Sequence, residues 1–477
     1  MRRWSNYLIF WGALLLCLGP RAWAQGTPGA AGPSAAGGNV NNFSAVGNSA
    51  QMSPLSLGGT VGQRGSLAGW QSYRNYRSGS AIRGGGVGGG RFAHLGPVDF
   101  SFSSYTTVNY DTNINNSSND PITDMYITAG FNLGINWVAT RRNQLQLSLG
   151  LNFTQYLENT EYNDNGILLA PYTGLDYRIY FLDFVLTLYD YPSITNGGGQ
   201  QSPALTNTAN FRQLSNSGGI SLLWHPNQLL FLTGFERSDV LSLSNEEFSS
   251  QNSLTYSWYG TISYDITPTT SVGIRLQASN TEYTQEILNN ALTTQTGLFY
   301  SSTLTEYTSL YLEAGIQTGT YSDTGRPTDE LVFQETNGVN TNVEGTLGGS
   351  DYTQPYFIFG ISNRLTRYLT QTVNISRLAS GSTVSDYQES NSASYQLQYR
   401  LNRLTNVGVM VNYEFGTISR TTDPAPYSNL TGRLDFTFAV RENTSVGVGW
   451  NYYQNSASEL NADYSRQIFS LSISHQF

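Results

Sequence analysis

The feature that most constrains this chain is a two-residue repeat of apolar and polar side chains, which recurs in separate stretches from residue 98 to the end. In one such stretch Val407, Val409, Val411, Tyr413 and Phe415 alternate with other residues. Successive side chains of a β-strand point to opposite faces of its sheet, so each stretch has one apolar and one polar face. This part of the chain is therefore predicted to be all-β.

The connections between these stretches are alternately short and long. Residues 141–143 and 441–443 form short connections, whereas 192–210 and 322–350 are long. Short turns at one end of the strands, longer loops at the other and an even strand number are typical of single-chain transmembrane barrels. Closing the sheet also leaves no unpaired strand edge in lipid. We therefore predict a transmembrane antiparallel up-and-down β-barrel.

We predict eighteen strands in this barrel. They span residues 98–110, 122–139, 144–157, 170–181, 183–191, 211–224, 228–240, 253–266, 270–283, 295–306, 308–321, 351–363, 369–380, 392–403, 405–418, 428–440, 444–454 and 463–477. Sixteen strands is the alternative, because the two strands that meet between Tyr180 and Asp183 are poorly separated. A barrel of either size leaves an aqueous lumen.

The N-terminal part lacks this pattern. Residues 1–24 have a basic start, an apolar stretch (Tyr7–Leu18) and small residues at the end, which predicts a signal peptide. They include Cys17, the only cysteine, so no disulfide is expected in the exported chain. Residues 25–97 are Gly-rich and lack acidic residues, which predicts a disordered periplasmic segment. An alternative role for this segment is a plug, and the barrel domain is then 98–477.

The composition favours a membrane barrel over a soluble domain. After residue 24 no apolar run approaches the roughly 18 residues of a transmembrane helix. Only 12% of the residues are charged, against about 25% in soluble domains. We expect an integral protein of the bacterial outer membrane, in contact with outer-membrane lipid and lipopolysaccharide. Its N-terminal segment and C-terminus are expected to be periplasmic.

Two short motifs resemble known signals. Tyr110-Asp111-Thr112-Asn113-Ile114 ends the first predicted strand and resembles the motif that opens the β-barrel porins encoded beside exopolysaccharide genes. Thr112 stands where that family has a second aspartate. The resemblance implies a conduit for polysaccharide export. The terminal Phe477, preceded on one face by Ile473, Leu471 and Phe469, resembles the signal recognised by the barrel-assembly machinery, which implies that machinery as a partner.

The polar faces of the strands predict the pore lining. The predicted pore-lining residues are Arg178, Arg275, Gln277, Glu313, Gln396, Gln398, Arg400, Glu414, Arg433 and Asp435. Glu414–Arg433 and Arg433–Asp435 are expected to be ion pairs within the wall. Arg275 and Arg400, with Gln277, Gln396 and Gln398 near them, are expected to contact a solute. Both signs of charge are present, so weak ion preference is expected.

The long loops are predominantly acidic and are predicted to form the outer mouth. The acidic residues assigned to it are Glu158, Glu161, Asp164, Glu246, Glu247, Asp329 and Glu330. Charge of one sign at an entrance concentrates counter-ions, so cations are expected to be favoured there. The alternative is that these loops are simply hydrophilic, bridged by divalent ions to lipopolysaccharide.

The residue supply argues against an enzyme. The three histidines, His94, His225 and His475, lie away from the outer strand ends, and no metal-ligand spacing occurs. We therefore expect no catalytic, cofactor or metal site, and no nucleic-acid partner. The predicted function is a diffusion pore for small hydrophilic solutes. The alternatives are polysaccharide export, for which Tyr453 is the one aromatic residue placed in the lumen, and a structural or adhesive barrel with a plugged lumen.

Overall fold

The computed structural model describes residues 93–163, 168–170, 173–196, 212–243, 252–284, 289–322, 351–382, 386–419, 424–457 and 462–477. The predicted signal peptide and nearly all of the Gly-rich segment lie outside the described residues. The long connection at 323–350 lies outside them as well.

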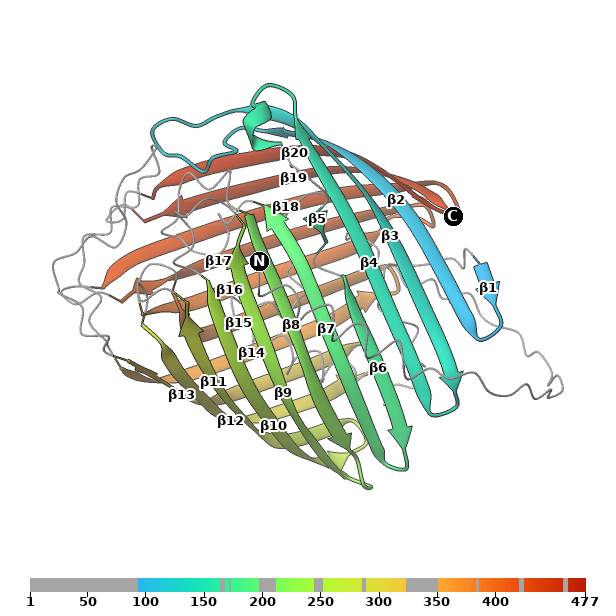
Figure 1. Ribbon diagram of the computed structural model, residues 1–477, viewed down its shortest axis with the longest axis vertical. Coiled ribbons are helices and arrows are strands. Elements are labelled where there is room, and N and C mark those ends of the chain that lie inside the picture. Colours follow the sequence, from blue (N-terminus) through green and yellow to red (C-terminus); the bar gives the residue numbers. More distant parts are fainter. Residues whose placement is uncertain are drawn as a thin grey trace, which may run out of the picture. The chain divides into compact units, whose positions relative to one another are not determined.

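Eighteen long strands form one closed antiparallel barrel (Figure 1). They are β2 (Val98–Asp111), β3 (Asp124–Thr140), β4 (Asn143–Tyr156), β6 (Gly174–Phe181), β7 (Phe184–Asn196), β8 (Arg212–Trp224), β9 (Leu229–Ser242), β10 (Ser253–Thr267), β11 (Thr270–Tyr283), β12 (Ala291–Thr305), β13 (Thr308–Tyr321), β14 (Tyr352–Thr366), β15 (Leu369–Gly381), β16 (Tyr387–Arg400), β17 (Thr405–Ile418), β18 (Ala425–Arg441), β19 (Thr444–Ser456) and β20 (Tyr464–Gln476). Each strand pairs with its sequence neighbours among these eighteen, and β2 pairs with β20 to close the sheet. The predicted fold class and strand number are confirmed.

Three short elements accompany the barrel. They are β1 (Ala93–Leu95), β5 (Leu168–Leu169) and the 3-10 helix η1 (Thr160–Tyr162). Among the described residues, no helix is long and apolar enough to cross a bilayer. Residues 93–97 were predicted to belong to the disordered segment, but β1 pairs with the start of β2 through a turn at Gly96, whose φ is +60°. Glycine adopts this left-handed conformation without strain.

The poorly separated pair of strands is divided by a tight turn. β6 ends at Phe181 and β7 begins at Phe184, and between them Leu182 has a φ of +50° and an almost fully exposed side chain. The rings of Phe181 and Phe184 stack across the turn with centroids 5.2 Å apart. No Gly, Pro or Asn marks this turn in the sequence, which explains why sixteen strands was a plausible but wrong alternative.

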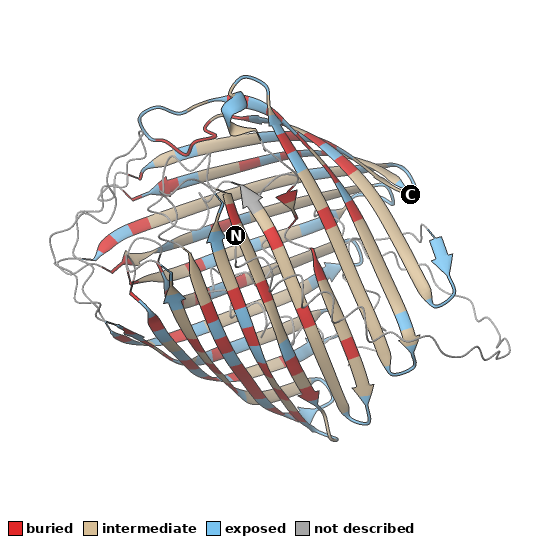
Figure 2. Cartoon of the chain, in the orientation of Figure 1, coloured by how far each residue is buried: buried red, intermediate tan, exposed pale blue. Residues whose placement is uncertain are grey.

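The two faces of the sheet differ as the alternation predicts. On β20, Phe469, Leu471 and Ile473 are about half exposed, whereas the intervening Ser470 and Ser472 are buried. Figure 2 shows buried residues recurring along the strands in this way. An outward apolar face and an inward polar face are what a bilayer-spanning barrel requires. Hereafter, the long-loop end is the end of the barrel at which β2 ends, and the short-turn end is the opposite one.

Candidate functional site: the inward wall of the barrel

The strand register places all of the predicted pore-lining residues on the inward, polar face. They come from β6, β11, β13, β16, β17 and β18. Their exposure differs, however. Arg178, Arg275, Gln277 and Glu313 are buried, whereas Gln398 is exposed and the remaining ones are partly exposed. The inward wall therefore has closed parts, in which the polar side chains are buried, and open parts, in which they are exposed to the lumen.

A cluster of buried charges lies on β11, β13 and β14. Arg275 Nη1 lies 2.8 Å from Glu313 Oε2, and these side chains are 8% and 0% exposed. The Tyr356 hydroxyl donates to Glu313 Oε1 at 2.8 Å, and the Tyr311 hydroxyl donates to the other carboxylate oxygen. Both charges are thus neutralised inside the wall. Arg275 was expected to contact a solute, but the structure places its guanidinium against Glu313.

Tyrosines lie flat on this wall because glycines stand opposite them. Tyr356 is the direct cross-strand partner of Gly315, and Tyr259 is the partner of Gly234. A Cβ atom at either glycine would collide with the tyrosine ring. A glycine leaves a gap in the side-chain layer, and a neighbouring aromatic ring fills it. These inward tyrosines are covered parts of the wall, and only knowledge of the register could have predicted them.

Other inward carboxylates also accept hydrogen bonds within the wall. The Tyr189 hydroxyl donates to Glu236 Oε2 at 2.9 Å, and the Tyr427 hydroxyl donates to Glu414 Oε1 at 2.8 Å. The predicted pair Arg433–Asp435 is present, with Arg433 Nε 2.5 Å from Asp435 Oδ2. The predicted pair of Glu414 with Arg433 is wrong, because Glu414 lies opposite Asn429, four residues from Arg433 along β18.

At the long-loop end, β15 leaves its neighbour β14. The ladder between them stops where Phe357 lies opposite Arg377. Beyond this point β14 stays paired with β13, and β15 stays paired with β16 as far as Gly381. The long-loop ends of these two strands, residues 378–381 of β15 and 387–390 of β16, are called the inturned ends below.

The inturned ends rest against the inward face of β13. Gln317 of β13 donates from Nε2 to the Ala379 carbonyl oxygen at 2.5 Å, and the Ala379 N–H donates to Gln317 Oε1 at 3.1 Å. These bonds replace the ladder that β14 no longer supplies. Because β14 separates β13 from β15 in the sheet, Ala379 can reach the Gln317 side chain only from the lumen side.

Aromatic packing supports the same arrangement. The ring centroids of Tyr321 and Tyr352 lie 6.3 and 4.6 Å from that of Tyr387, which belongs to the inturned ends. Asn289 Nδ2 also donates to Asp386 Oδ1 at 2.9 Å. The wall is two layers thick here, so the lumen is narrowed at its long-loop end. The sequence did not predict this constriction.

The open part of the wall lies on β16 toward the short-turn end. Gln396, Gln398 and Arg400 follow one another on its inward face. Gln398 stands between Thr370 and Gly408 on the neighbouring strands. These small neighbours do not cover it, so it is exposed. Tyr453 on β19 is also inward and only partly buried, as expected.

Two of the predicted mouth residues belong to the described part of the chain. Glu158 follows β4 and Glu161 lies in η1, and both are exposed. The backbone N–H of Glu158 donates to the Asp124 carboxylate at 3.2 Å, which holds this connection against the first residue of β3. The other predicted mouth residues lie outside the described residues; they are Asp164, Glu246, Glu247, Asp329 and Glu330.

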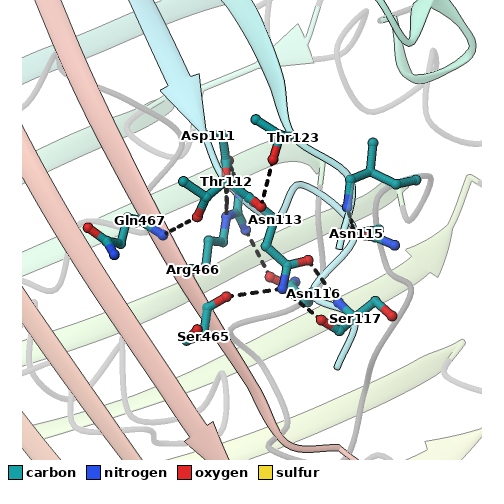
Figure 3. A network of polar contacts seen from close by, with 11 residues as sticks. Asp111, Thr112, Asn113, Asn115, Asn116, Ser117, Thr123, Ser465, Arg466 and Gln467 are labelled. Atoms are coloured by element: carbon teal, nitrogen blue, oxygen red, sulfur yellow. Dashed lines mark hydrogen bonds and ion pairs between the residues drawn. The ribbon is translucent and has the colours of Figure 1, made fainter. Parts of the chain in front are cut away.

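The Tyr-Asp-Thr-Asn-Ile motif lies where the first strand meets the last. The fully buried Asp111 carboxylate accepts bonds from Arg466 of β20, from Nη2 at 2.6 Å and from Nε at 3.0 Å (Figure 3). Arg466 also donates to Asn116 Oδ1, and Asn113 Nδ2 donates to the Ser465 carbonyl oxygen at 3.0 Å. The motif therefore fastens the barrel seam at the long-loop end.

In the described part of the chain, no group of three or more His, Cys, Asp or Glu side chains could hold a metal ion. His94 contacts Asp99 beside β1, His225 lies 3.6 Å from Asp265 beside a short turn, and His475 bonds Thr444 on the outward face.

No protein-family model matches the sequence, and no curated protein matches it significantly. Solved structures to which the chain is similar include the outer membrane protein opdK from Pseudomonas aeruginosa, at 12% identity and a TM-score of 0.45. That match covers 80% of this chain and 98% of that one. OccAB3 from Acinetobacter baumannii is 11% identical with a TM-score of 0.46, covering 80% and 100% of the two chains. A BenF-like porin from Pseudomonas fluorescens Pf-5 is 10% identical with a TM-score of 0.47, covering 81% and 100%.

Proposed function

We propose that this chain is an outer-membrane pore through which small hydrophilic solutes diffuse. The observation that carries the proposal is the closed eighteen-strand barrel with an apolar outward face and a polar inward face. Barrels of sixteen to eighteen strands are too wide for wall side chains to fill and enclose an aqueous channel. The inturned ends narrow this channel and limit the size of solute that passes.

The wall chemistry favours small polar solutes with little selection by charge. Arg178, Arg275 and Arg433 lie beside inward carboxylates. The side chains assigned to contact a solute are Gln396, Gln398 and Arg400, which are at least partly exposed. The acidic mouth residues Glu158, Glu161, Asp164, Glu246, Glu247, Asp329 and Glu330 are assigned a mild preference for cations.

Polysaccharide export is the weaker alternative. A polysaccharide conduit needs open aromatic faces on which sugar rings can stack, whereas Tyr189, Tyr259 and Tyr356 are buried in the wall. Tyr453 is a single ring, and a path for a polysaccharide needs several. The motif on which the family resemblance rests, residues 110–114, makes its contacts with β20 at the barrel seam. A plugged structural barrel would depend on residues 25–92, which lie outside the described residues.

The proposed orientation places the short-turn end and both termini in the periplasm. The proposed partners are outer-membrane lipid, lipopolysaccharide, the barrel-assembly machinery and the passing solutes. Phe477 supports the assembly role because it is 45% exposed at the short-turn end. Its ring centroid lies 5.0 Å from that of Phe102, and its N–H donates to the Phe102 carbonyl oxygen. The signal is thus held in a defined position.

Single-channel conductance of the refolded protein in planar bilayers tests the proposal. Stable conductance steps with modest cation preference are expected. The full exported chain should be compared with a variant that starts at Ala93, so that any block by residues 25–92 is measured directly. Silence from both proteins, while each shows the heat-dependent gel shift of a folded barrel, would overturn the diffusion pore.

A further inference from the structure

One sector of the outward face carries charged and amide side chains among its apolar ones. Asp190 of β7, Asn216 of β8, Arg237 and Asp239 of β9 and Glu282 of β11 all point outward by the strand register. We call these five residues the outward polar patch. Charged side chains on the lipid face of a barrel are destabilising, most strongly at the bilayer midplane. This sector therefore needs an explanation other than contact with lipid tails.

Each patch residue has a polar contact on the same outward surface. Arg237 Nη2 lies 2.9 Å from Asp239 Oδ1, yet the Arg237 side chain remains 48% exposed. Asp190 accepts a hydrogen bond from Asn216 and lies over Gly218, where an added Cβ would be 2.9 Å from its Oδ1. Asn280 donates to Glu282 at 3.0 Å. These contacts organise the patch but leave polar surface directed outward.

A strand of equal length on another part of the barrel has the expected apolar residues. β9 (Leu229–Ser242) and β17 (Thr405–Ile418) each have 14 residues and both begin at the short-turn end. At their ninth positions stand Arg237 and Tyr413, and at their eleventh positions stand Asp239 and Phe415. Tyr413 and Phe415 are outward and about half exposed. The patch thus replaces apolar and aromatic residues at the same height on the barrel.

We propose that the outward polar patch binds the same patch of a second copy of this chain, side by side in the membrane. The patch carries three acids and one arginine, so a two-fold arrangement sets Arg237 of each copy against acids of the other. Two-fold interfaces use one surface twice and must be self-complementary in this way. The same charges disfavour the phosphates of lipopolysaccharide, which would face Asp190, Asp239 and Glu282.

Cysteine cross-linking in proteoliposomes tests the proposal with a matched control. The only cysteine is Cys17, in the predicted signal peptide, so an introduced thiol is unique in the exported protein. Tyr256→Cys places it beside Arg237, the cross-strand partner of Tyr256. Leu430→Cys is the control, because Leu430 is also outward and, like Tyr256, lies eleven residues before the end of its strand.

A bis-maleimide reagent is expected to join Tyr256→Cys proteins into dimers and to leave Leu430→Cys proteins monomeric. Adding Arg237→Glu to Tyr256→Cys makes the patch entirely acidic, so the dimer should be lost while the heat-dependent gel shift persists. The mass of the unmodified protein in nanodiscs should be that of a dimer. A monomer mass or equal cross-linking of both variants would overturn the proposal. It would also be overturned if the protein were a monomer with bound lipopolysaccharide and Arg237→Glu released that lipopolysaccharide. None of these measurements depends on conductance.

Discussion

Two parts of the inward wall look alike in sequence and differ in structure. Arg275 and Gln277 on β11 alternate with apolar residues, as do Gln396, Gln398 and Arg400 on β16. The β11 pair is buried, with the arginine held against a carboxylate that also accepts two tyrosine hydroxyls, whereas Gln398 is exposed between small neighbours. Alternation therefore assigns a side chain to a face, and its cross-strand neighbours decide whether a solute can reach it.

The largest expected effect is on stability, from breaking the buried cluster. Glu313→Ala leaves the Arg275 charge without its partner, and loss of one member of a buried ion pair costs about 3–5 kcal/mol. Gln398→Ala in the open part should change the free energy of unfolding by less than about 0.5 kcal/mol. Urea unfolding of both variants in the same lipid or detergent measures the contrast.

A double variant separates the charge effect from the packing effect. Arg275→Met with Glu313→Leu removes both charges and keeps most of the volume, so it should be clearly more stable than Glu313→Ala. Equal destabilisation by the double and single variants would contradict an electrostatic origin. Wild-type stability for Glu313→Ala would remove the distinction between closed and open wall.

The next effect concerns the constriction. Gln317→Ala removes both side-chain bonds to the Ala379 backbone and leaves buried polar groups, at a cost of about 2 kcal/mol. With this attachment lost, the inturned ends should move more freely and the single-channel conductance should rise. Thr318→Ala is the control, because Thr318 is the next residue on β13 and points outward. An unchanged conductance in Gln317→Ala would mean that the inturned ends do not limit ion flow.

The sequence predicted the architecture well because closure in lipid leaves few alternatives. All eighteen strands, the short and long connections and the face of every predicted wall residue follow from a period of two. The features that it missed depend on contacts between strands. Gly315 reads as an unremarkable strand glycine until the register places Tyr356 opposite it. The early end of the β14–β15 ladder has no local signature in the sequence. The lost bonds are replaced by Gln317, which lies 62 residues from its partner Ala379 in the sequence.

A smaller effect is expected on ion selectivity. Arg400→Gln removes a charge in the open part, and one charge at about 4 Å in water changes the energy of an ion by about 1 kcal/mol. Reversal potentials in a salt gradient should therefore shift toward cations by up to several-fold in permeability ratio. Arg275→Gln should shift them far less, because Arg275 does not face the open lumen. A larger shift for Arg275→Gln would reverse the assignment of closed and open wall.

The smallest effect is expected at the mouth, where the charges are fully solvated. Glu158→Gln with Glu161→Gln removes two exposed acids. The preference for cations should therefore fall slightly when the more concentrated salt solution is on the long-loop side of the bilayer. The Debye length is about 30 Å at 0.01 M and about 3 Å at 1 M. The shift in reversal potential should therefore be measurable at low salt and vanish at high salt. Glu442→Gln, an exposed acid in a short turn, should act only from the opposite side of the bilayer. A shift that persists at 1 M would show that these acids contact the permeating ions directly and belong to the open wall.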